Sequence, residues 1–384
     1  MKKTKIIHVI TRMDWGGSPD IVRQIFVSLR QEPFDLYLVF GLTKNCTQQT
    51  KDFLKDFKYK SVYIPSLRRE INPFMDFMAF LKLCRIFYRL KPDIITTHTA
   101  KAGALGRLAA FCLGIKKVIH FPHGNIFYGY FNKAISLFIL KVEQFLSVIT
   151  RRIIVSTESE KAILLRLGLT NKDKIMVLPA GIDPLPPPDK DWLKRERSSL
   201  GIKEEDFVVG MVSRLEPVKG AEYFMLAALK ILESRNDVYF LVVGEGSLSA
   251  KLKLWASNHK KKDKIIFTGW REDAGVLMGV MDILVQPSLN EAIGRVLLQA
   301  QGLGIAVIAT QVGGIPDIVS NGVTGILIPP AETETLARAI VSLLSDTAKR
   351  EAFAKKGMEF VKSRFSLEIM ARGIRQLYQE EAYK

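Results

Sequence analysis

Short apolar runs rich in valine and isoleucine alternate with longer stretches of helical periodicity along most of the chain. This alternation is the strongest constraint on the fold, because such runs are typical of strands buried on both faces of a parallel sheet. In the first half we expect strands at Lys5–Thr11, Leu36–Gly41, Ser61–Ile64, Asp93–His98, Lys117–Phe121, Arg152–Ser156 and Ile175–Leu178. The first half therefore predicts an α/β domain built on a parallel sheet.

A proline cluster then breaks the pattern: residues 184–189 read PLPPPD, which suits a stiff connector. The alternation restarts beyond it, with runs at Asp206–Ser213, Val238–Gly244, Lys264–Gly269, Ile283–Pro287, Ile305–Thr310 and Gly325–Ile328. We therefore predict two similar Rossmann-like domains, residues 1–184 and 185–365, which suits a chain of 384 residues. Residues 366–384 continue as a helix able to pack back on the first domain.

The net charge of +17 is large enough to attract nucleic acid, anionic lipid or a nucleotide. It is unevenly spread: residues 1–184 hold 29 Lys and Arg against 14 Asp and Glu, and residues 185–384 hold 27 against 25. No RRM, zinc-finger or helix-turn-helix signature accompanies the charge, so nucleic acid is not an expected partner. An anionic membrane surface is the expected one, with scattered surface lysines as the alternative.

Cysteine usage and hydropathy bear on the compartment. Cys46, Cys84 and Cys112 form no CxxC pair and show no metal-ligand spacing to the five histidines, so we expect a reducing, cytoplasmic compartment and no metal. The N-terminal MKKTKIIHVIT lacks a small-residue cleavage site and reads as a strand. Charges interrupt the most hydrophobic helical stretch, Ala134–Thr150, before it reaches the ~18 apolar residues of a membrane span.

Glycine-rich turns follow several expected strands. Gly16 and Gly17 open a loop just before a helix, where backbone amides could approach a phosphate or sugar, although a plain turn would look the same. Gly244 begins a GEG sequence that lacks the third glycine and the acidic residue of a dinucleotide fingerprint. A bound NAD is therefore not supported.

Charged residues follow the strands of the second half. Arg214 and Lys219 come after a buried strand, and two cations at one strand end suit a diphosphate, with solvated basic residues as the alternative. Glu291 stands just before a helix, where an acid is also favoured by the helix dipole, and Gln299 follows about two turns along. In the first half, His98 and His120 end strands and are expected to be packing residues, whereas His123 lies in a loop and is expected to be functional.

The order and spacing of these motifs resemble the retaining glycosyltransferases of family 4, which have the GT-B architecture. In the second half the resemblance rests on SRLEPVKG, VVGEGSL, IIFTGW, PSLNEAIGRVLLQA and VGGIPDIV. In the first half it rests on WGGS, TTHTAKAGALGRLAA and HFPHGN. The resemblance implies two facing Rossmann-like βα domains that transfer a sugar from a nucleotide donor, usually a UDP-sugar, in the cleft between them.

The resemblance also implies roles for particular residues. Arg214 and Lys219 would clamp the diphosphate without a metal ion, and Glu291 would accept hydrogen bonds from the hexose. His123 would lie against the donor sugar near the anomeric carbon. Further donor contacts are implied for Gly16, Gly17, Gly244, Trp270, Ile293, Gly294 and Gln299. Retention of configuration would follow from attack on the front face, the departing phosphate taking the acceptor proton.

One departure from the family pattern affects the donor site, because the family has a second glutamate where this chain has Gln299. An amide offers one acceptor oxygen instead of two, so we expect donor affinity to be lower by on the order of tenfold. The expected reaction moves a hexose or N-acetylhexosamine to a glycan or lipid-linked acceptor in cell-surface polysaccharide, lipopolysaccharide or glycolipid synthesis. A nucleotide-sugar epimerase and a non-catalytic nucleotide-sugar-binding protein are the alternatives.

The segment from Ile126 to Arg152 combines bulky apolar side chains with Lys133, Lys141, Arg151 and Arg152. Its apolar members are Phe127, Tyr128, Tyr130, Phe131, Leu137, Phe138, Leu140, Phe145 and Leu146. Such a mixture is typical of a helix that lies in the headgroup region of an anionic membrane. We therefore expect peripheral association with the inner face of the cytoplasmic membrane, with burial of these side chains against the sheet as the alternative.

Overall fold

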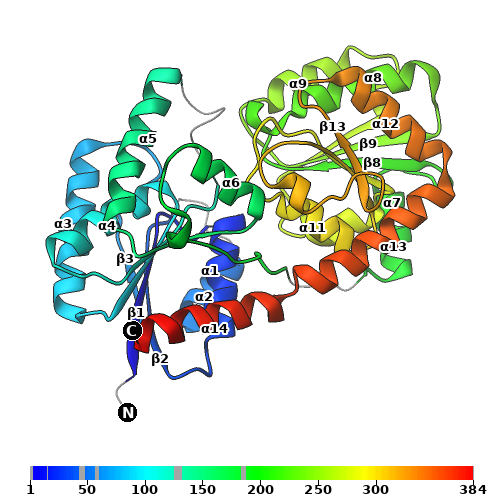
Figure 1. Cartoon of the computed structure of the whole chain (residues 1–384). Helices are drawn as coiled ribbons and strands as arrows, with labels where there is room; N and C mark the ends of the chain where they lie inside the picture. The colour runs from blue at the N-terminus through cyan, green and yellow to red at the C-terminus, as the bar shows by residue number, and fades with distance from the viewer. Residues whose placement is uncertain are drawn as a thin grey trace. The chain divides into compact units, whose positions relative to one another are not determined.

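The computed structural model describes residues 3–14, 16–42, 48–56, 60–124, 132–182 and 187–383. The chain divides into two compact units, residues 1–181 together with 367–384, and residues 182–366. The boundary expected at 184/185 falls among residues 183–186, outside the described part of the chain. Each unit is an α/β structure around its own sheet (Figure 1).

The first unit contains a parallel sheet in the order β3-β2-β1-β4-β5-β6-β7. Its strands are β1 (Thr4–Ile10), β2 (Phe34–Phe40), β3 (Ser61–Tyr63), β4 (Ile94–His98), β5 (Val118–Phe121), β6 (Arg152–Val155) and β7 (Ile175–Val177). Its helices are α1 (Gly17–Ser28), α2 (Gln48–Asp56), α3 (Pro73–Leu90), α4 (Ala100–Cys112), α5 (Lys133–Val148), α6 (Glu158–Arg166) and α14 (Leu367–Tyr383).

Local sequence sets where the helices of this unit begin. In α3 the Asn72 side chain accepts a hydrogen bond from the Met75 amide at 3.0 Å, Pro73 occupies the first turn, and Asp76 accepts from the Asn72 amide. These are the N-terminal signals of a helix, since they satisfy amides that lack an intrahelical partner. The helix then buries Leu83 and Phe87 in the core that α3 and α4 share with the sheet.

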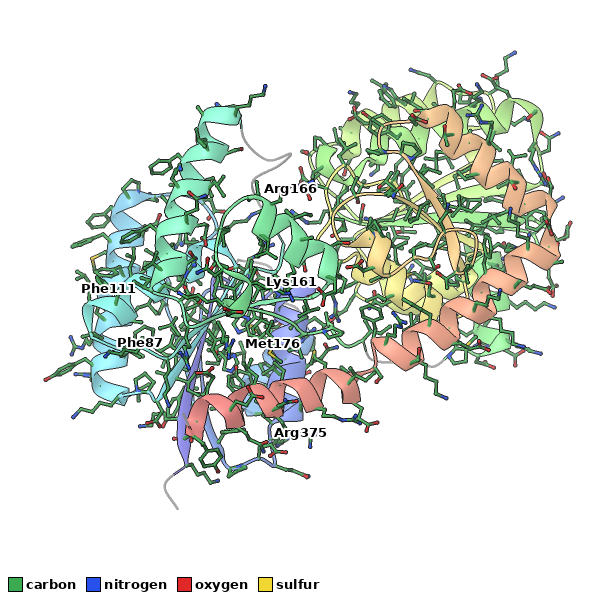
Figure 2. The ribbon with its side chains drawn as sticks, viewed as in Figure 1. Phe87, Phe111, Lys161, Arg166, Met176 and Arg375 are labelled. Carbon is green, nitrogen blue, oxygen red and sulfur yellow. The ribbon has the colours of Figure 1, made fainter. Side chains whose placement is uncertain are left out.

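The C-terminal helix α14 packs on the first unit beside α1 (Figure 1). Tyr378 is fully buried, and Arg375, labelled in Figure 2, donates to Glu32 in the loop before β2. Near the end of the helix the buried Glu381 carboxylate pairs with Arg151 and Arg152 at 3.2 and 3.3 Å. Residues far apart in sequence therefore complete one core.

The second unit contains a parallel sheet in the order β10-β9-β8-β11-β12-β13. Its strands are β8 (Phe207–Val212), β9 (Val238–Val243), β10 (Ile265–Gly269), β11 (Ile283–Gln286), β12 (Ala306–Thr310) and β13 (Gly325–Ile328). Its helices are α7 (Lys190–Ser199), α8 (Ala221–Ser234), α9 (Ser249–Ser257), α10 (Ala274–Leu277), α11 (Arg295–Gly302), α12 (Thr333–Ser345) and α13 (Thr347–Arg364). Every strand expected from the apolar runs is present in the two sheets, with ends that differ by one or two residues, and the α/β prediction is confirmed.

Candidate active site

The carboxyl edge of the second sheet gathers the residues that the sequence singled out in that half. Arg214 follows β8, Gly244 follows β9, Trp270 follows β10 and Glu291 follows β11. Ligands of open α/β sheets bind at this edge, because the loops that leave parallel strands meet there. Trp270 is half exposed, with 49% of its surface accessible.

Lys219 and Glu291 form an ion pair at this edge. The Lys219 Nζ donates to Glu291 Oε2 at 2.5 Å, and both side chains are largely buried, with 15% and 14% of their surface exposed. The Gln286 amide and the Ser288 hydroxyl lie 3.3 and 3.4 Å from the same carboxylate oxygen. Lys219 lies five residues after Arg214, but it pairs with a carboxylate that is 72 positions away in sequence.

Close backbone contacts hold the loops that carry this pair. The Leu289 amide donates to the Val218 carbonyl at 2.8 Å, which ties the loop after β11 to the turn before α8. Gly220 has a φ of 71°, and a Cβ there would lie 1.8 Å from the Pro287 carbonyl oxygen. Gly313 has a φ of 55° and approaches the Glu291 backbone just as closely. Only glycine fits at these two positions, which fix where Lys219 and Glu291 stand.

Arg214 and Lys219 both follow β8, but they differ in solvent exposure and in their side-chain partners. It is exposed, and its guanidinium makes no hydrogen bond or ion pair with any residue that the structure describes. The sequence suggested two equivalent cations. The structure instead shows one exposed cation and one that is already engaged with Glu291.

Helix α11 begins later than expected. It starts at Arg295, so Glu291 lies in the loop, and Gln299 is just over one turn into the helix. The reason is Gly294, whose left-handed φ of 66° cannot continue a helix toward Glu291. Ile293 is buried, whereas the half-buried Gln299 side chain has no hydrogen-bond partner within the described part of the chain.

The first unit also places its candidates at the carboxyl edge of a sheet. Gly16 precedes α1 with a φ of 145°, and its carbonyl accepts from the Asp20 amide, while Trp15 of the WGGS motif lies outside the described residues. His123 follows β5 and adopts a left-handed φ of 55°. Its Nε2 lies 2.8 Å from His98 Nδ1, and the two rings stack.

Sequence reasoning missed what His98 contacts. It is buried, as expected of a packing residue, but besides His123 it also contacts His8 of β1, Nε2 to Nδ1, at 3.0 Å. Burial lowers the pKa of His98 well below its usual value, and the neighbouring His123 and His8 lower it further. The available signal was His8, a polar residue between the apolar pairs Ile6–Ile7 and Val9–Ile10 of β1. His120 is buried against Gly103 and bonded to Thr97, as a packing residue would be.

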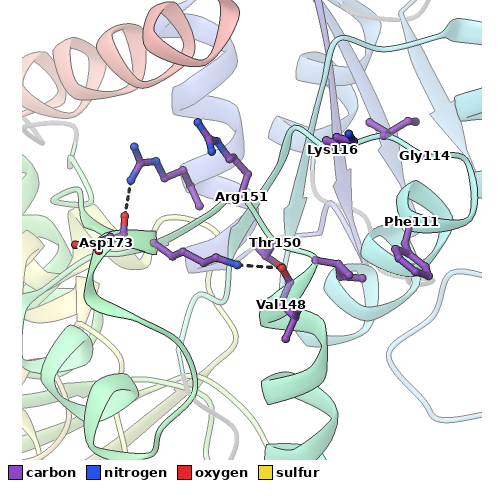
Figure 3. Close-up of a pocket in the computed structure, with 11 residues that line it drawn as sticks. Phe111, Gly114, Lys116, Val148, Thr150, Arg151 and Asp173 are labelled. Atoms are coloured by element: carbon purple, nitrogen blue, oxygen red, sulfur yellow. Dashed lines mark hydrogen bonds between the residues drawn. The ribbon is translucent and has the colours of Figure 1, made fainter. Parts of the chain in front are cut away.

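A cavity of about 680 Å³ lies at the opposite, amino-terminal edge of the first sheet (Figure 3). It lies at the starts of β5, β6 and β7, so it contains none of the candidate site residues. Its charged lining residues are Lys116, Arg151, Arg152, Asp173 and Lys174.

Among the described residues, no group of three or more His, Cys, Asp and Glu side chains is placed to hold a metal ion.

Comparison with known proteins identifies the family. Residues 15–184 match the model of Glycosyltransferase Family 4, and residues 194–360 match that of Glycosyl transferases group 1. The chain is 31% identical over 350 residues to the UDP-Gal:alpha-D-GlcNAc-diphosphoundecaprenol alpha-1,3-galactosyltransferase of Escherichia coli, covering 90% of this chain and 89% of that one. It is 27% identical over 386 residues to the capsular polysaccharide biosynthesis glycosyltransferase CapM of Staphylococcus aureus, covering 98% and 97%.

Solved structures agree on the architecture. Anabaena HepE in complex with UDP superposes with a TM-score of 0.81 over 98% of this chain and all of that one, at 22% identity. At that identity the likeness establishes the fold, and the expected GT-B architecture is confirmed. With both halves matched by family models and a relative that aligns over nearly its whole length, the chain belongs to the group 1, family 4 glycosyltransferases and is a glycosyltransferase.

Proposed function

We propose that this glycosyltransferase moves a hexose or N-acetylhexosamine from a UDP-sugar to a glycan or lipid-linked acceptor, with retention of anomeric configuration and without a metal ion. The observation that carries the proposal is the Lys219–Glu291 pair at the carboxyl edge of the second sheet, where Arg214 also follows a strand and has no side-chain partner among the described residues. It sets cations for a diphosphate next to a carboxylate that can accept hydrogen bonds from sugar hydroxyls. The diphosphate and the sugar of a nucleotide sugar could thus be held side by side.

In the proposed reaction the acceptor oxygen bonds to the anomeric carbon on the face from which the diphosphate departs. The bond between that carbon and the phosphate oxygen breaks, and the departing phosphate takes the acceptor proton. Arg214 and Lys219 neutralise the charge that grows on the leaving group, and this stabilisation replaces that of a metal ion. Glu291 orients the hexose, and His123 lies near the anomeric carbon.

Two relatives support the choice of substrates. The Escherichia coli relative is named for a UDP-galactose donor and a diphosphoundecaprenol-linked acceptor, and HepE was solved with UDP. Further donor contacts are proposed on the family resemblance for Gly16, Gly17, Gly244, Trp270, Ile293 and Gly294, which lie in or next to the turns that follow strands, and for Gln299 in the first half of α11.

The test is to incubate the full chain with labelled nucleotide sugars and with lipid-linked or glycan acceptors, and to determine the anomeric configuration of the product by NMR. Transfer from a UDP-sugar with retention in EDTA supports the proposal. Interconversion of free nucleotide sugars without transfer would indicate an epimerase. Donor binding without turnover would indicate a binding protein, and either result would overturn the proposal. Glu291→Gln is the matched inactive control.

We further propose that the first unit docks on an anionic membrane through two helices, α3 and α5, which both contact α4. The exposed apolar side chains of α3 recur at helical spacing, at Phe74, Phe77, Met78, Leu81 and Tyr88. Those of α5 are Ile135, Leu137, Phe138, Phe145 and Val148. Exposed cations accompany them, at Lys82, Arg85, Arg89, Lys133 and Lys141.

The two stripes fit a surface that enters the headgroup region, because apolar side chains partition there while neighbouring Lys and Arg meet anionic lipid. Leu146 is buried and Leu140 packs on the sheet. For those two side chains the alternative, burial against the sheet, therefore holds. Residues 125–131, which include four aromatics of the expected stripe, lie outside the described part. The α3 stripe was not anticipated from sequence. In the described residues, no helix is long and apolar enough to cross a bilayer.

Flotation of the full chain with liposomes tests this proposal. The protein should float with phosphatidylglycerol vesicles at low salt and be released at ~0.5 M salt, where the Debye length is about 4 Å. Phe77→Ser combined with Phe138→Ser should weaken flotation, whereas Leu254→Ser, at an exposed position of the second unit, should not. Equal recovery with neutral and anionic vesicles, or none with either, would contradict membrane docking by charge.

A further inference from the structure

A row of hydrogen-bonded side chains leads from His123 into the core of the first unit. His123 Nε2 lies 2.8 Å from His98 Nδ1, and His98 Nε2 lies 3.0 Å from His8 Nδ1. His8 Nε2 lies 3.1 Å from the Tyr378 hydroxyl, which lies 2.9 Å from Thr96 Oγ1. The row crosses from the loop after β5 through β4 and β1 to the C-terminal helix α14.

The inner members of the row are buried and uncharged. His8, His98, Thr96 and Tyr378 are inaccessible to solvent. Burial lowers the pKa of His8 to about 3 and that of His98 well below its usual value, and burial raises the pKa of Tyr378. Both histidines are therefore neutral and the tyrosine keeps its proton at physiological pH.

Neutral imidazoles impose one direction on such a row. Each carries one proton, so it donates through one nitrogen and accepts through the other. If His98 accepts at Nε2 it must donate from Nδ1, and the same rule applies to His8. All the hydrogen bonds therefore point toward His123, or all point away from it.

The tyrosine at the inner end favours the first direction. An imidazole nitrogen is a stronger base than a phenol oxygen, so the Tyr378 hydroxyl donates to His8 Nε2 and accepts from Thr96. His8 and His98 then each carry their proton on Nδ1, and His98 donates to His123 Nε2. His123, with Nε2 occupied as an acceptor, must hold its own proton on Nδ1.

We propose that His98, oriented by His8 and Tyr378, is a positioning residue that fixes His123 in the tautomer with its proton on Nδ1. The inference rests on the proposed function in one respect, the action of His123 at the donor sugar. With its proton fixed on Nδ1, His123 would donate a hydrogen bond from that nitrogen to an oxygen of the donor sugar. In this tautomer Nδ1 cannot act as a base. The rings of His98, Phe121 and His123 pack against one another with centroids 5.0 to 5.9 Å apart, which holds the ring planes in place.

NMR of the full chain labelled with ¹⁵N-histidine reads the tautomers directly, and five histidines make the spectrum tractable. His8, His98 and His123 should show a protonated Nδ1 and an unprotonated Nε2. His259 is an internal reference for the opposite tautomer, because its Nδ1 accepts from the Lys261 amide at 3.1 Å. A proton on Nε2 of His123 in the unsubstituted protein would overturn the proposal.

Two substitutions at His98 separate positioning from packing. His98→Asn keeps an amide donor near the position of Nδ1, whereas His98→Phe keeps an aromatic ring and removes the donor. We expect His98→Phe to lower kcat by about tenfold with little change in the donor KM, and His98→Asn to recover most of that loss. Equal kcat in the two variants would overturn the proposal. If no donor is turned over at all, the proposed function fails, while the NMR measurement still decides the tautomer.

Discussion

Replacing Lys219 by alanine should impair both stability and sugar transfer, whereas replacing Arg214 should impair transfer alone. Lys219 holds Glu291 in an ion pair that is about 85% buried, and once the ammonium is gone the carboxylate keeps, among the described residues, its contacts to Gln286 and Ser288 at 3.3 and 3.4 Å. Breaking a fully buried pair costs about 3–5 kcal/mol and an exposed pair contributes below about 1, so we expect a loss of about 2 kcal/mol.

For a unit of residues 182–366 this loss lowers Tm by about 4–8 °C. Arg214→Ala removes a side chain with no partner in the described residues, so its Tm should stay within about 1 °C of the unsubstituted protein. Each substitution should slow transfer by at least ~10²-fold, about 2.7 kcal/mol of transition-state stabilisation.

Thermal melting by circular dichroism, beside a transfer assay with labelled donor, measures both effects. Lys219→Ala combined with Glu291→Gln should recover most of the lost Tm without recovering activity, because the uncharged amide no longer needs a cation. An unchanged Tm in Lys219→Ala, or an equal fall in Arg214→Ala, would refute the assignment of Glu291 as the main partner of Lys219.

Three further outcomes are expected. His123→Ala should slow turnover while lowering Tm by no more than about 4 °C, since it removes the hydrogen bond to His98 at a half-buried position; unfolding or normal turnover would mean that His123 has a structural role. Gln299→Glu should leave UDP-sugar affinity unchanged or tighten it by up to about tenfold in isothermal titration, and clear weakening would mean that the Gln299 amide donates to the ligand. Transfer should persist in EDTA, and complete loss restored by Mn²⁺ would rule out a diphosphate site built from Arg214 and Lys219 alone.

Much of the fold could be read from the sequence because buried parallel strands have a local signature. Each apolar run from Lys5–Thr11 to Gly325–Ile328 carries that signature within a few residues, and each became a strand. The strand ends then placed Arg214, Glu291 and His123 at the carboxyl edges of the two sheets, since strands and loops alternate in a fixed order.

Tertiary structure decided how those residues pair, because their partners are distant along the chain. Lys219 pairs with Glu291, which is distant in sequence, since β8 and β11 are neighbours in the sheet order and the loops that follow them meet. The start of α11 depends on the left-handed backbone of Gly294.

His98 could not be assigned from its own surroundings in the sequence. Its neighbours in space include His8 from β1 and, through it, Tyr378 from α14, which belongs to the first unit although residues 182–366 separate it from the rest of that unit in sequence. The sequence by itself determined which segments become strands and where their loops emerge, because periodicity and turn chemistry are local. Only the packed structure decided which charges neutralise each other and which histidine orients another, because those contacts depend on burial and on distance in space.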